Sequence, residues 1–345
     1  MPAFDPNDLP FPRGLPEFQQ IFPDDAACAA YLEAIRWPNG FVCPCGEAGE
    51  PYRVKTRPQV LVCRKCRKET RLMANTVMQD SHTRLSIWFW GAYLVATQTP
   101  GMSAIQFQRQ LCLTRYETAF QILHKLRAGM VRPDQDRIGS NMNNHVELDE
   151  VWIGGASHGK GRGVHDKTLV VAAVEVRRRK PKDGSKAIIR RNGRYAGRVR
   201  LQVVPDRSAK SLIGFVQNAV EPGAQIVSDA WRGFNTLPEK GYRHVPVALS
   251  GSATLAEDYL PIIHLVFSNL KSWLRGIHHG VSPQHLQAYL NEYTFRFNRR
   301  FTPFNAFKSL LGIGAQNAAS TYASLYSGEW EHPRCSDRLM QGISV

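Results

Sequence analysis

Two stretches of this chain decide its fold, Val146-Glu147-Leu148-Asp149-Glu150-Val151-Trp152-Ile153-Gly154-Gly155 and Ala224-Gln225-Ile226-Val227-Ser228-Asp229-Ala230-Trp231-Arg232-Gly233. Each is typical of an apolar strand that carries, or ends on, an aspartate and runs into a turn with glycine. An aspartate in a turn beside glycine is the common alternative. Asp149 argues against it, because it lies inside a strand-like run, where Asp is depleted.

The pattern around these stretches predicts an α/β fold with a mixed sheet. The order is β-β-β-α-β, with one aspartate on the first strand and the other after the strand that follows the helix. That order is the one of a ribonuclease H-like fold, and two later helices would flank the sheet. The predicted strands are 146–153, 167–176, 198–204, 225–228 and 242–249, and the predicted helices are 208–219, capped by Ser208, then 264–277 and 282–299.

The two aspartates suggest a chemistry. Two-metal phosphoryl transfer needs oxygen ligands that hold the ions about 4 Å apart, and carboxylates on neighbouring strands meet that need. Asp149 and Asp229 are therefore our candidate ligands for two divalent ions, Mg²⁺ or Mn²⁺. Asn269 lies at the edge of the apolar face of helix 264–277, where its amide oxygen could complete a Mg²⁺ shell. An ordinary surface asparagine is the alternative.

The charge balance indicates the partner. The 345 residues include 44 Lys and Arg against 29 Asp and Glu, a formal net charge of +15. Such a chain favours a polyanion, and nucleic acid before membrane, because no segment approaches the ~20 apolar residues of a membrane span. A merely basic soluble protein is the alternative. The N-terminus shows no signal-peptide pattern, so we expect a cytoplasmic protein.

The cysteines predict a structural zinc site. Cys63-Arg64-Lys65-Cys66 has the usual spacing of a zinc knuckle, whereas Cys43-Pro44-Cys45 is one residue short. Residues 46–62 separate the pairs, within the usual gap of about 15–20 residues. A zinc ribbon is the prediction, and a degenerate ribbon with weakened metal binding is the alternative.

Residues 84–130 are predicted to be helical. Ser103 and Thr114 each open a capping-box pattern, and the two short helices that follow resemble a helix-turn-helix. A plain helical hairpin is equally compatible with the pattern. If the second helix binds DNA, its contacts would come from Arg115, Thr118, Gln121, Lys125 and Arg127.

These patterns predict the domain order. We expect a leader and short helix over 1–39, a zinc ribbon over 40–80 and a helix-turn-helix-like segment over 81–131. A ribonuclease H-like catalytic domain over 145–305 and a C-terminal tail over 306–345 would follow. The run 177–200 would form a basic hairpin.

The chain also resembles a known family, the bacterial insertion-sequence transposases of the ISXO type, over roughly residues 20–305. The resemblance rests on Glu147–Gly155, Val227–Phe234 and Ser268–Gly276, and continues through His278–Ser282 and His285–Leu290 to Phe295-Arg296-Phe297-Asn298-Arg299-Arg300. The short Cys43–Cys45 pair departs from the family pattern.

The resemblance implies that Asp149 and Asp229 are the catalytic carboxylates, and that Asn269 replaces the usual third glutamate. It also implies a basic catalytic residue after the third ligand, for which Lys271 is preferred to Arg275. Metal-dependent cleavage of the element's ends in double-stranded DNA would free 3′-OH groups that attack target DNA. The chain would form a homo-oligomer when it pairs two ends, in the cytoplasm and with the nucleoid of a bacterium. Along the DNA path, the implied contacts include Arg275, Arg296, Arg299 and Arg300.

Two other functions remain compatible with the sequence. One is a zinc-ribbon DNA-binding protein whose ribonuclease H-like core is catalytically inactive. The other is a structure-specific nuclease that cuts DNA without strand transfer. The intact aspartate pair favours an enzyme over the first alternative, and only the products of the reaction would distinguish the second.

Overall fold

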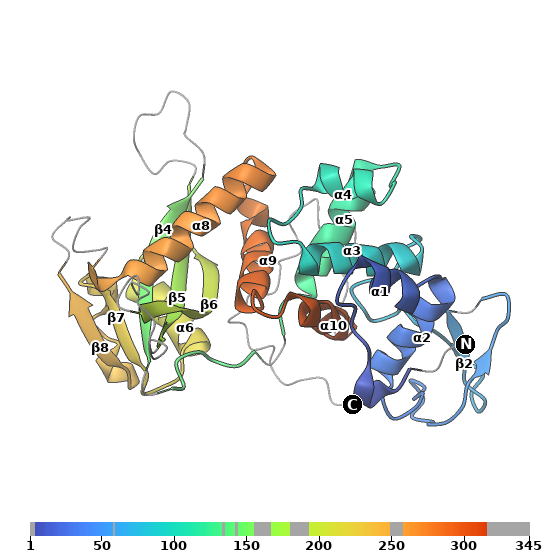
Figure 1. Cartoon of the computed structure of the whole chain (residues 1–345). Coiled ribbons are helices and arrows are strands. Elements are labelled where there is room, and N and C mark those ends of the chain that lie inside the picture. The colour runs from blue at the N-terminus through green and yellow to red at the C-terminus, as the bar shows by residue number, and fades with distance from the viewer. Residues whose placement is uncertain are drawn as a thin grey trace, which may run out of the picture. The chain divides into compact units, whose positions relative to one another are not determined.

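A computed structural model describes residues 4–57, 59–132, 135–141, 144–154, 167–179, 193–248 and 258–315. The chain divides into two compact units, one of residues 1–131 with 299–331 and the other of residues 132–298 with 332–345. Figure 1 shows the elements of both units. The predicted basic hairpin over 177–200 is described only at its two ends, and most of the predicted tail over 306–345 lies outside the described residues.

The second unit is built on a five-stranded mixed sheet. Its strands are β4 (His145–Ile153), β5 (Thr168–Arg178), β6 (Arg194–Val204), β7 (Gln225–Asp229) and β8 (Arg243–Val247), in the spatial order β6-β5-β4-β7-β8. The first three strands pair antiparallel, whereas β7 and β8 continue the sheet in parallel from β4. The mixed α/β sheet predicted from the sequence is confirmed.

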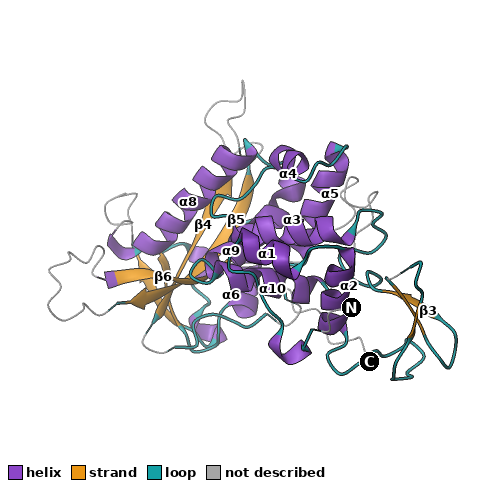
Figure 2. Cartoon of the chain, turned by 45° about the vertical axis from the view of Figure 1, so that its right-hand side comes forward, coloured by secondary structure: helices purple, strands orange, loops and turns teal. Residues whose placement is uncertain are grey.

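Helices cover both faces of this sheet. Helix α6 (Ala209–Ala219) packs on one face, over a core that includes Val146 and Leu148. Helices α8 (Pro261–His278) and α9 (Leu286–Asn298) pack on the other, over Val170, Ala172 and Val174. Figures 1 and 2 show α8 running along β4. Because side chains alternate along a strand, β4 directs its odd-numbered residues from 147 to α8.

Three of the α-helices that the structure describes begin at a side-chain cap. Asp24 accepts a hydrogen bond from the Ala27 amide and caps α2 (Asp25–Arg36), and Ser103 and Ser208 cap α4 (Ala104–Gln110) and α6 in the same way. The cap predicted at Thr114 is wrong. Helix α5 (Tyr116–Ala128) begins after Arg115, whose side chain makes no capping hydrogen bond.

Side chains from α9 close the free edge of β6. The Val199 amide donates to Asn298 Oδ1 at 2.8 Å, and Asn298 Nδ2 donates to the Val199 carbonyl at 3.1 Å. Farther along, the Val203 amide donates to Gln287 Oε1 at 2.9 Å. Three-turn spacing puts both polar side chains on one face of α9. At the opposite edge, β8 contains Pro246, which has no amide hydrogen to offer a further strand.

The first unit packs its helices around aromatic side chains. Its helices include α1 (Leu15–Ile21), α2, α3 (Leu85–Thr97), α4, α5 and α10 (Pro303–Gly314). Phe307 of α10 contacts Phe18 and Tyr93 at ring-centroid distances of 5.9 and 6.1 Å. These contacts place α10 in the first unit. The helix spans residue 305, where the sequence predicts the catalytic domain to end.

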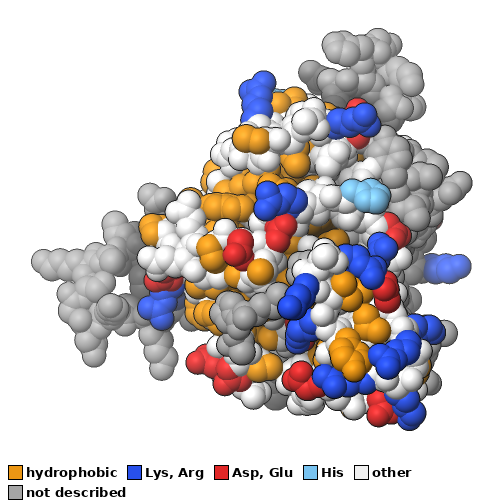
Figure 3. Space-filling view, turned by 90° about the vertical axis from the view of Figure 1, so that its right-hand side faces the viewer, with side chains coloured by type: hydrophobic (Ala, Val, Ile, Leu, Met, Phe, Trp, Pro, Cys, Tyr) orange, Lys and Arg blue, Asp and Glu red, His pale blue; other side chains and the backbone are white. Residues whose placement is uncertain are grey.

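A small antiparallel sheet of β1 (Tyr52–Arg53), β2 (Val60–Val62) and β3 (Glu69–Arg71) accompanies the cysteines in this unit. Its basic side chains are partly paired, as in Arg53 with Glu33, Arg57 with Glu69 and Lys65 with Glu47. On the face shown in Figure 3, Lys and Arg side chains lie among Asp and Glu side chains. Among the described helices, none combines the length and the apolar character needed to cross a bilayer.

Candidate metal centre

Asp149 and Asp229 come together on the sheet, as the sequence predicts. The β4–β7 pairing aligns Glu147 with Val227 and Leu148 with Ser228, so the next position in this parallel register sets Asp149 beside Asp229. One carboxylate oxygen from each of Asp149, Glu150 and Asp229 lies within 4.8 Å of the other two. The sheet thus concentrates three acidic groups at the end of two parallel strands.

The surroundings of Asp149 disfavour its negative charge. Its Oδ1 accepts a hydrogen bond from the Glu150 amide at 2.8 Å. Burial, together with the charges of Glu150 and Asp229, nevertheless raises the pKa of the Asp149 carboxyl to about 8. Burial also raises the pKa of Glu150. A divalent cation would stabilise the negative charge of these crowded carboxylates, and carboxylate oxygens are ligands that such cations prefer. These residues therefore fit a metal ion.

Glu150 differs from the two aspartates in having a cationic partner. Its side chain points to the α6 side of β4 and pairs with Arg207, whose guanidinium stacks on the Trp231 ring at 4.0 Å from the centroid. Trp231 in turn donates its indole N–H to the Arg207 carbonyl at 3.2 Å. Asp229 Oδ1 accepts from the Trp231 amide at 3.2 Å, so the loop after β7 is tied to the carboxylates.

Helix α8 meets the carboxylates through two residues that the sequence analysis missed. Glu147 is fully buried, and its Oε2 accepts hydrogen bonds from the Ile262 and Ile263 amides at 2.9 and 2.7 Å. Burial raises the pKa of Glu147 to about 7, although these hydrogen bonds oppose the shift. One residue further on, His264 Nε2 lies 3.9 Å from Asp149 Oδ2. A signal was present, because Glu147 is a charged residue on the Asp149 face of a strand.

The other predicted residues of α8 lie farther along the helix. Asn269, Lys271 and Arg275 are exposed. Lys271 and Arg275 line a pocket of about 400 Å³ beyond the end of β4, together with Trp152 and Lys167. The structure therefore joins the two basic candidates in one pocket, next to the strand that carries Asp149.

The four clustered cysteines converge despite the short first pair. Cys43 Sγ lies 3.6 Å from Cys66 Sγ, and Cys45 Sγ lies 3.8 Å from Cys63 Sγ. Four thiolates at about 2.3 Å from a tetrahedral zinc ion would lie about 3.8 Å apart. Gly46 has a φ of +86°, which lets the chain turn back directly after Cys45. The cluster is consistent with a zinc ribbon.

The predicted DNA-binding residues have different surroundings. Arg115 is exposed, and Thr118 and Gln121 are half-buried on α5. Lys125 is buried and donates to the Gln79 carbonyl at 2.7 Å, and Arg127 is 1% exposed. Neither of these two side chains is presented to a partner, because both are buried.

The C-terminal basic residues are partly exposed. Arg296 contacts Glu292 at 3.5 Å within α9, and Arg300 stacks on the exposed Phe301 ring at 4.5 Å. Arg299 is half-exposed after the end of α9. All three arginines lie in the stretch Phe295–Arg300. Arg296 belongs to the second unit, whereas Arg299 and Arg300 belong to the first.

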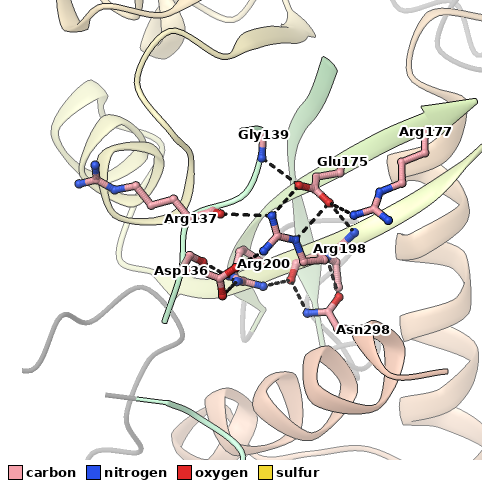
Figure 4. A network of polar contacts seen from close by, with 9 residues as sticks. Asp136, Arg137, Gly139, Glu175, Arg177, Arg198, Arg200 and Asn298 are labelled. Carbon is pink, nitrogen blue, oxygen red and sulfur yellow. Dashed lines mark hydrogen bonds and ion pairs between the residues drawn. The ribbon is translucent and has the colours of Figure 1, made fainter. Parts of the chain in front are cut away.

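A second buried charge cluster lies across the same sheet (Figure 4). Glu175 on β5 accepts hydrogen bonds from Arg198 Nη2 at 2.9 Å, from Arg177 Nη2 at 3.0 Å and from the Gly139 amide at 3.0 Å. These partners lower the pKa of Glu175 to about 2 against the opposing effect of burial. A bulge between Val174 and Val176 and the absence of a side chain at Gly197 make room for the cluster.

Two family models match the chain. The ISXO2-like transposase domain (IS1595) matches residues 141–298, which carry the mixed sheet and its carboxylates. The transposase zinc-ribbon domain (IS1595) matches residues 23–69, which carry the four cysteines. The chain therefore belongs to the IS1595 family of insertion-sequence transposases. No curated protein and no solved structure matches it.

Proposed function

We propose that this transposase cuts the ends of an insertion sequence and joins the freed 3′-OH ends to target DNA at the Asp149–Asp229 site. The observation that carries the proposal is the convergence of the two aspartates, with the pKa of Asp149 raised, inside a domain of transposase sequence. Cytoplasmic, nucleoid-associated action on double-stranded DNA, by a homo-oligomer that pairs two ends, is part of the same proposal.

The residues divide the work by position. Asp149 and Asp229 would hold two Mg²⁺ or Mn²⁺ ions, which when bound supply Lewis acids for the attacking and leaving oxygens. Lys271 and Arg275, four residues apart on α8, would contact the phosphates of the bound strand from the pocket beside β4. Arg207 keeps Glu150 paired on the α6 side, so the negative charge available to metal comes mainly from the two aspartates.

Strand transfer tests this proposal. A labelled element end is incubated with target DNA and Mn²⁺, with wild type beside Asp149→Asn and Asp229→Asn. Joined products that appear with wild type and vanish with either variant are the expected result. Glu239→Gln, an exposed carboxylate on the 3-10 helix Pro238–Lys240, is the matched control and should behave as wild type.

Other products would reject the proposal. DNA binding without cleavage or joining in the wild type would identify a DNA-binding protein with an inactive core. Cleavage without joined strands would identify a nuclease.

We also infer that Cys43, Cys45, Cys63 and Cys66 bind one structural zinc ion. The sulfur distances and the match to a transposase zinc ribbon support this inference. Mass spectrometry under native conditions should find one zinc per chain, lost in Cys63→Ser. Cys112→Ser, at an exposed cysteine outside the cluster, should keep it, and a zinc-free wild type would contradict the inference.

The domain order predicted from sequence remains our proposal for function. In it, the ribbon and the α4–α5 pair contact the element's ends, with Arg115, Thr118 and Gln121 as the DNA-facing side chains of α5. Arg296, Arg299 and Arg300 would add phosphate contacts, so binding should weaken steeply with salt.

A further inference from the structure

The face of the sheet on which Asp149 and Asp229 lie is covered by helix α8, which can present a further ligand to them. Both aspartates are on the α8 side of the sheet, in register with Glu147 and Val227. Glu150 also offers a carboxylate oxygen within 4.8 Å of both aspartates, but its side chain is already paired with Arg207. Helix α8 covers the aspartate side and is the element from which a further ligand on that side would project.

We propose that His264, not Asn269, is the ligand that α8 contributes, an inference that rests on the metal site of the proposed function. His264 Nε2 lies 3.9 Å from Asp149 Oδ2. Two ligands at about 2.1 Å from one octahedral ion lie about 3 Å apart when adjacent and about 4.2 Å apart when opposite. The observed separation falls between these limits, so one ion can reach both atoms.

Helix geometry separates the two candidates. At about 100° per residue, Asn269 points about 140° away from His264 around the axis of α8. His264 faces Asp149, so Asn269 is turned away from that carboxylate, and its side chain is exposed. Lys271, seven residues after His264, points within about 20° of it. His264 and Lys271 can thus face one substrate together, whereas Asn269 and Lys271 lie on nearly opposite sides of the helix.

A buried anchor fixes the position of His264. Glu147 lies two residues before Asp149 on β4. Its side chain accepts hydrogen bonds from the Ile262 and Ile263 amides, in the first turn of α8. A carboxylate at a helix N-terminus satisfies free amides and favours the helix dipole. The same strand therefore carries one ligand, Asp149, and holds the helix turn that presents the other.

An imidazole ligand changes the choice of metal. Mg²⁺ prefers oxygen ligands and octahedral waters, whereas first-row transition metals accept imidazole and bind more tightly in the order from Mn²⁺ towards Cu²⁺. A site of two aspartates and one histidine should accordingly favour Mn²⁺ over Mg²⁺ more strongly than a site with only oxygen ligands.

Electron paramagnetic resonance of bound Mn²⁺ tests the proposal without an activity assay. In the full-length protein, electron spin echo modulation from one histidine nitrogen should appear on bound Mn²⁺ and disappear in His264→Ala. Mn²⁺ affinity should fall at least about tenfold in that variant. His264→Glu should restore Mn²⁺ binding with an oxygen ligand but without nitrogen modulation, which also shows that the variant is folded.

Two matched controls keep the test specific. Asn269→Ala should retain both Mn²⁺ affinity and nitrogen modulation. His244→Ala changes a half-buried histidine that contacts Ser228, next to Asp229 but on the opposite face of β7, and should retain the modulation.

The results distinguish this inference from the proposed function. Modulation that persists in His264→Ala, or Mn²⁺ affinity that falls in Asn269→Ala instead, would overturn the role of His264 while leaving the aspartate site standing. Mn²⁺ that fails to bind wild type any better than Asp149→Asn would overturn the metal site itself, and the proposed function with it.

Discussion

The sheet of the second unit contains two buried carboxylate regions that treat negative charge in opposite ways. Around Glu175, two arginines and a backbone amide face one carboxylate, and its pKa falls to about 2. Around Asp149, two further carboxylates face it, and its pKa rises to about 8. The first region balances its own charge and stabilises the fold. The second leaves its negative charge unbalanced, so a cation from outside would stabilise it, as in a binding site rather than a structural one.

Removing the carboxylate of each region should therefore have opposite effects on stability. Glu175→Ala removes the carboxylate that Arg177 and Arg198 share, while Asp136 still pairs with Arg198, and should lower the free energy of unfolding by about 3 kcal/mol. Asp149→Asn removes charge repulsion and should leave metal-free stability unchanged or higher. Urea unfolding of the two variants beside wild type measures both, and equal losses would break the comparison.

A divalent cation should stabilise only the second region. Mn²⁺ at about 100 times its dissociation constant should raise the free energy of unfolding by about 2.7 kcal/mol. The gain should persist in Glu175→Ala and vanish in Asp149→Asn. Thermal unfolding with Mn²⁺ and with a chelator gives the measurement. A gain that survives in Asp149→Asn would mean that the ion binds elsewhere.

The two regions should also respond to pH with opposite signs. The pKa of Glu175 is lowered from 4.5 to about 2, so its stabilisation is complete above about 4.5 and is lost as pH falls towards 2. Because its arginine partners are partly exposed, we expect a loss of about 2 kcal/mol. The pKa of Asp149 is raised from 3.8 to about 8, so the metal-free protein should lose stability as pH rises through that interval. Glu175→Gln should weaken the acid limb, and Asp149→Asn should weaken the alkaline limb, part of which remains because the pKa of Glu147 is also raised, to about 7.

The smallest effect concerns a neutral neighbour of the Glu175 region. The uncharged side chain of Asn298 forms hydrogen bonds with both the backbone amide and the carbonyl of Val199, next to Arg198. Asn298→Ala should cost about 1–2 kcal/mol, less than Glu175→Ala, and the loss should not depend on pH. A pH-dependent loss would mean that Asn298 acts through the charged cluster.

Periodicity predicted the elements that carry local signals. Strands β4 and β7 were found because apolar residues surround Asp149 and Asp229, and α6 was found because Ser208 caps an amphipathic stretch. These features depend on residues close in sequence. The convergence of Asp149 and Asp229 was also predicted. In a ribonuclease H-like strand order the two strands are neighbours, so their aspartates come to the same edge of the sheet.

Features set by distant contacts were not predicted. Helix α8 begins at Pro261 rather than near His264, because its first amides bond Glu147, more than a hundred residues earlier. Most of helix α10 was predicted to be part of a C-terminal tail. Its packing on α3 joins residues far apart in sequence, which local patterns do not reveal. The family pattern drew attention to Asn269, while the approach of His264 to Asp149 required the fold.

The two edges of the sheet have a consequence for association between copies. Exposed strand edges pair readily with other strands and seed aggregation. Here the amide side chains of Gln287 and Asn298 occupy hydrogen-bonding groups of β6, and Pro246 withholds an amide hydrogen from a strand beside β8. Extension of this sheet by a strand of a second copy is therefore disfavoured at these positions of both edges. If several copies bind side by side on DNA, as the proposed function implies, these edges disfavour fusion of their sheets.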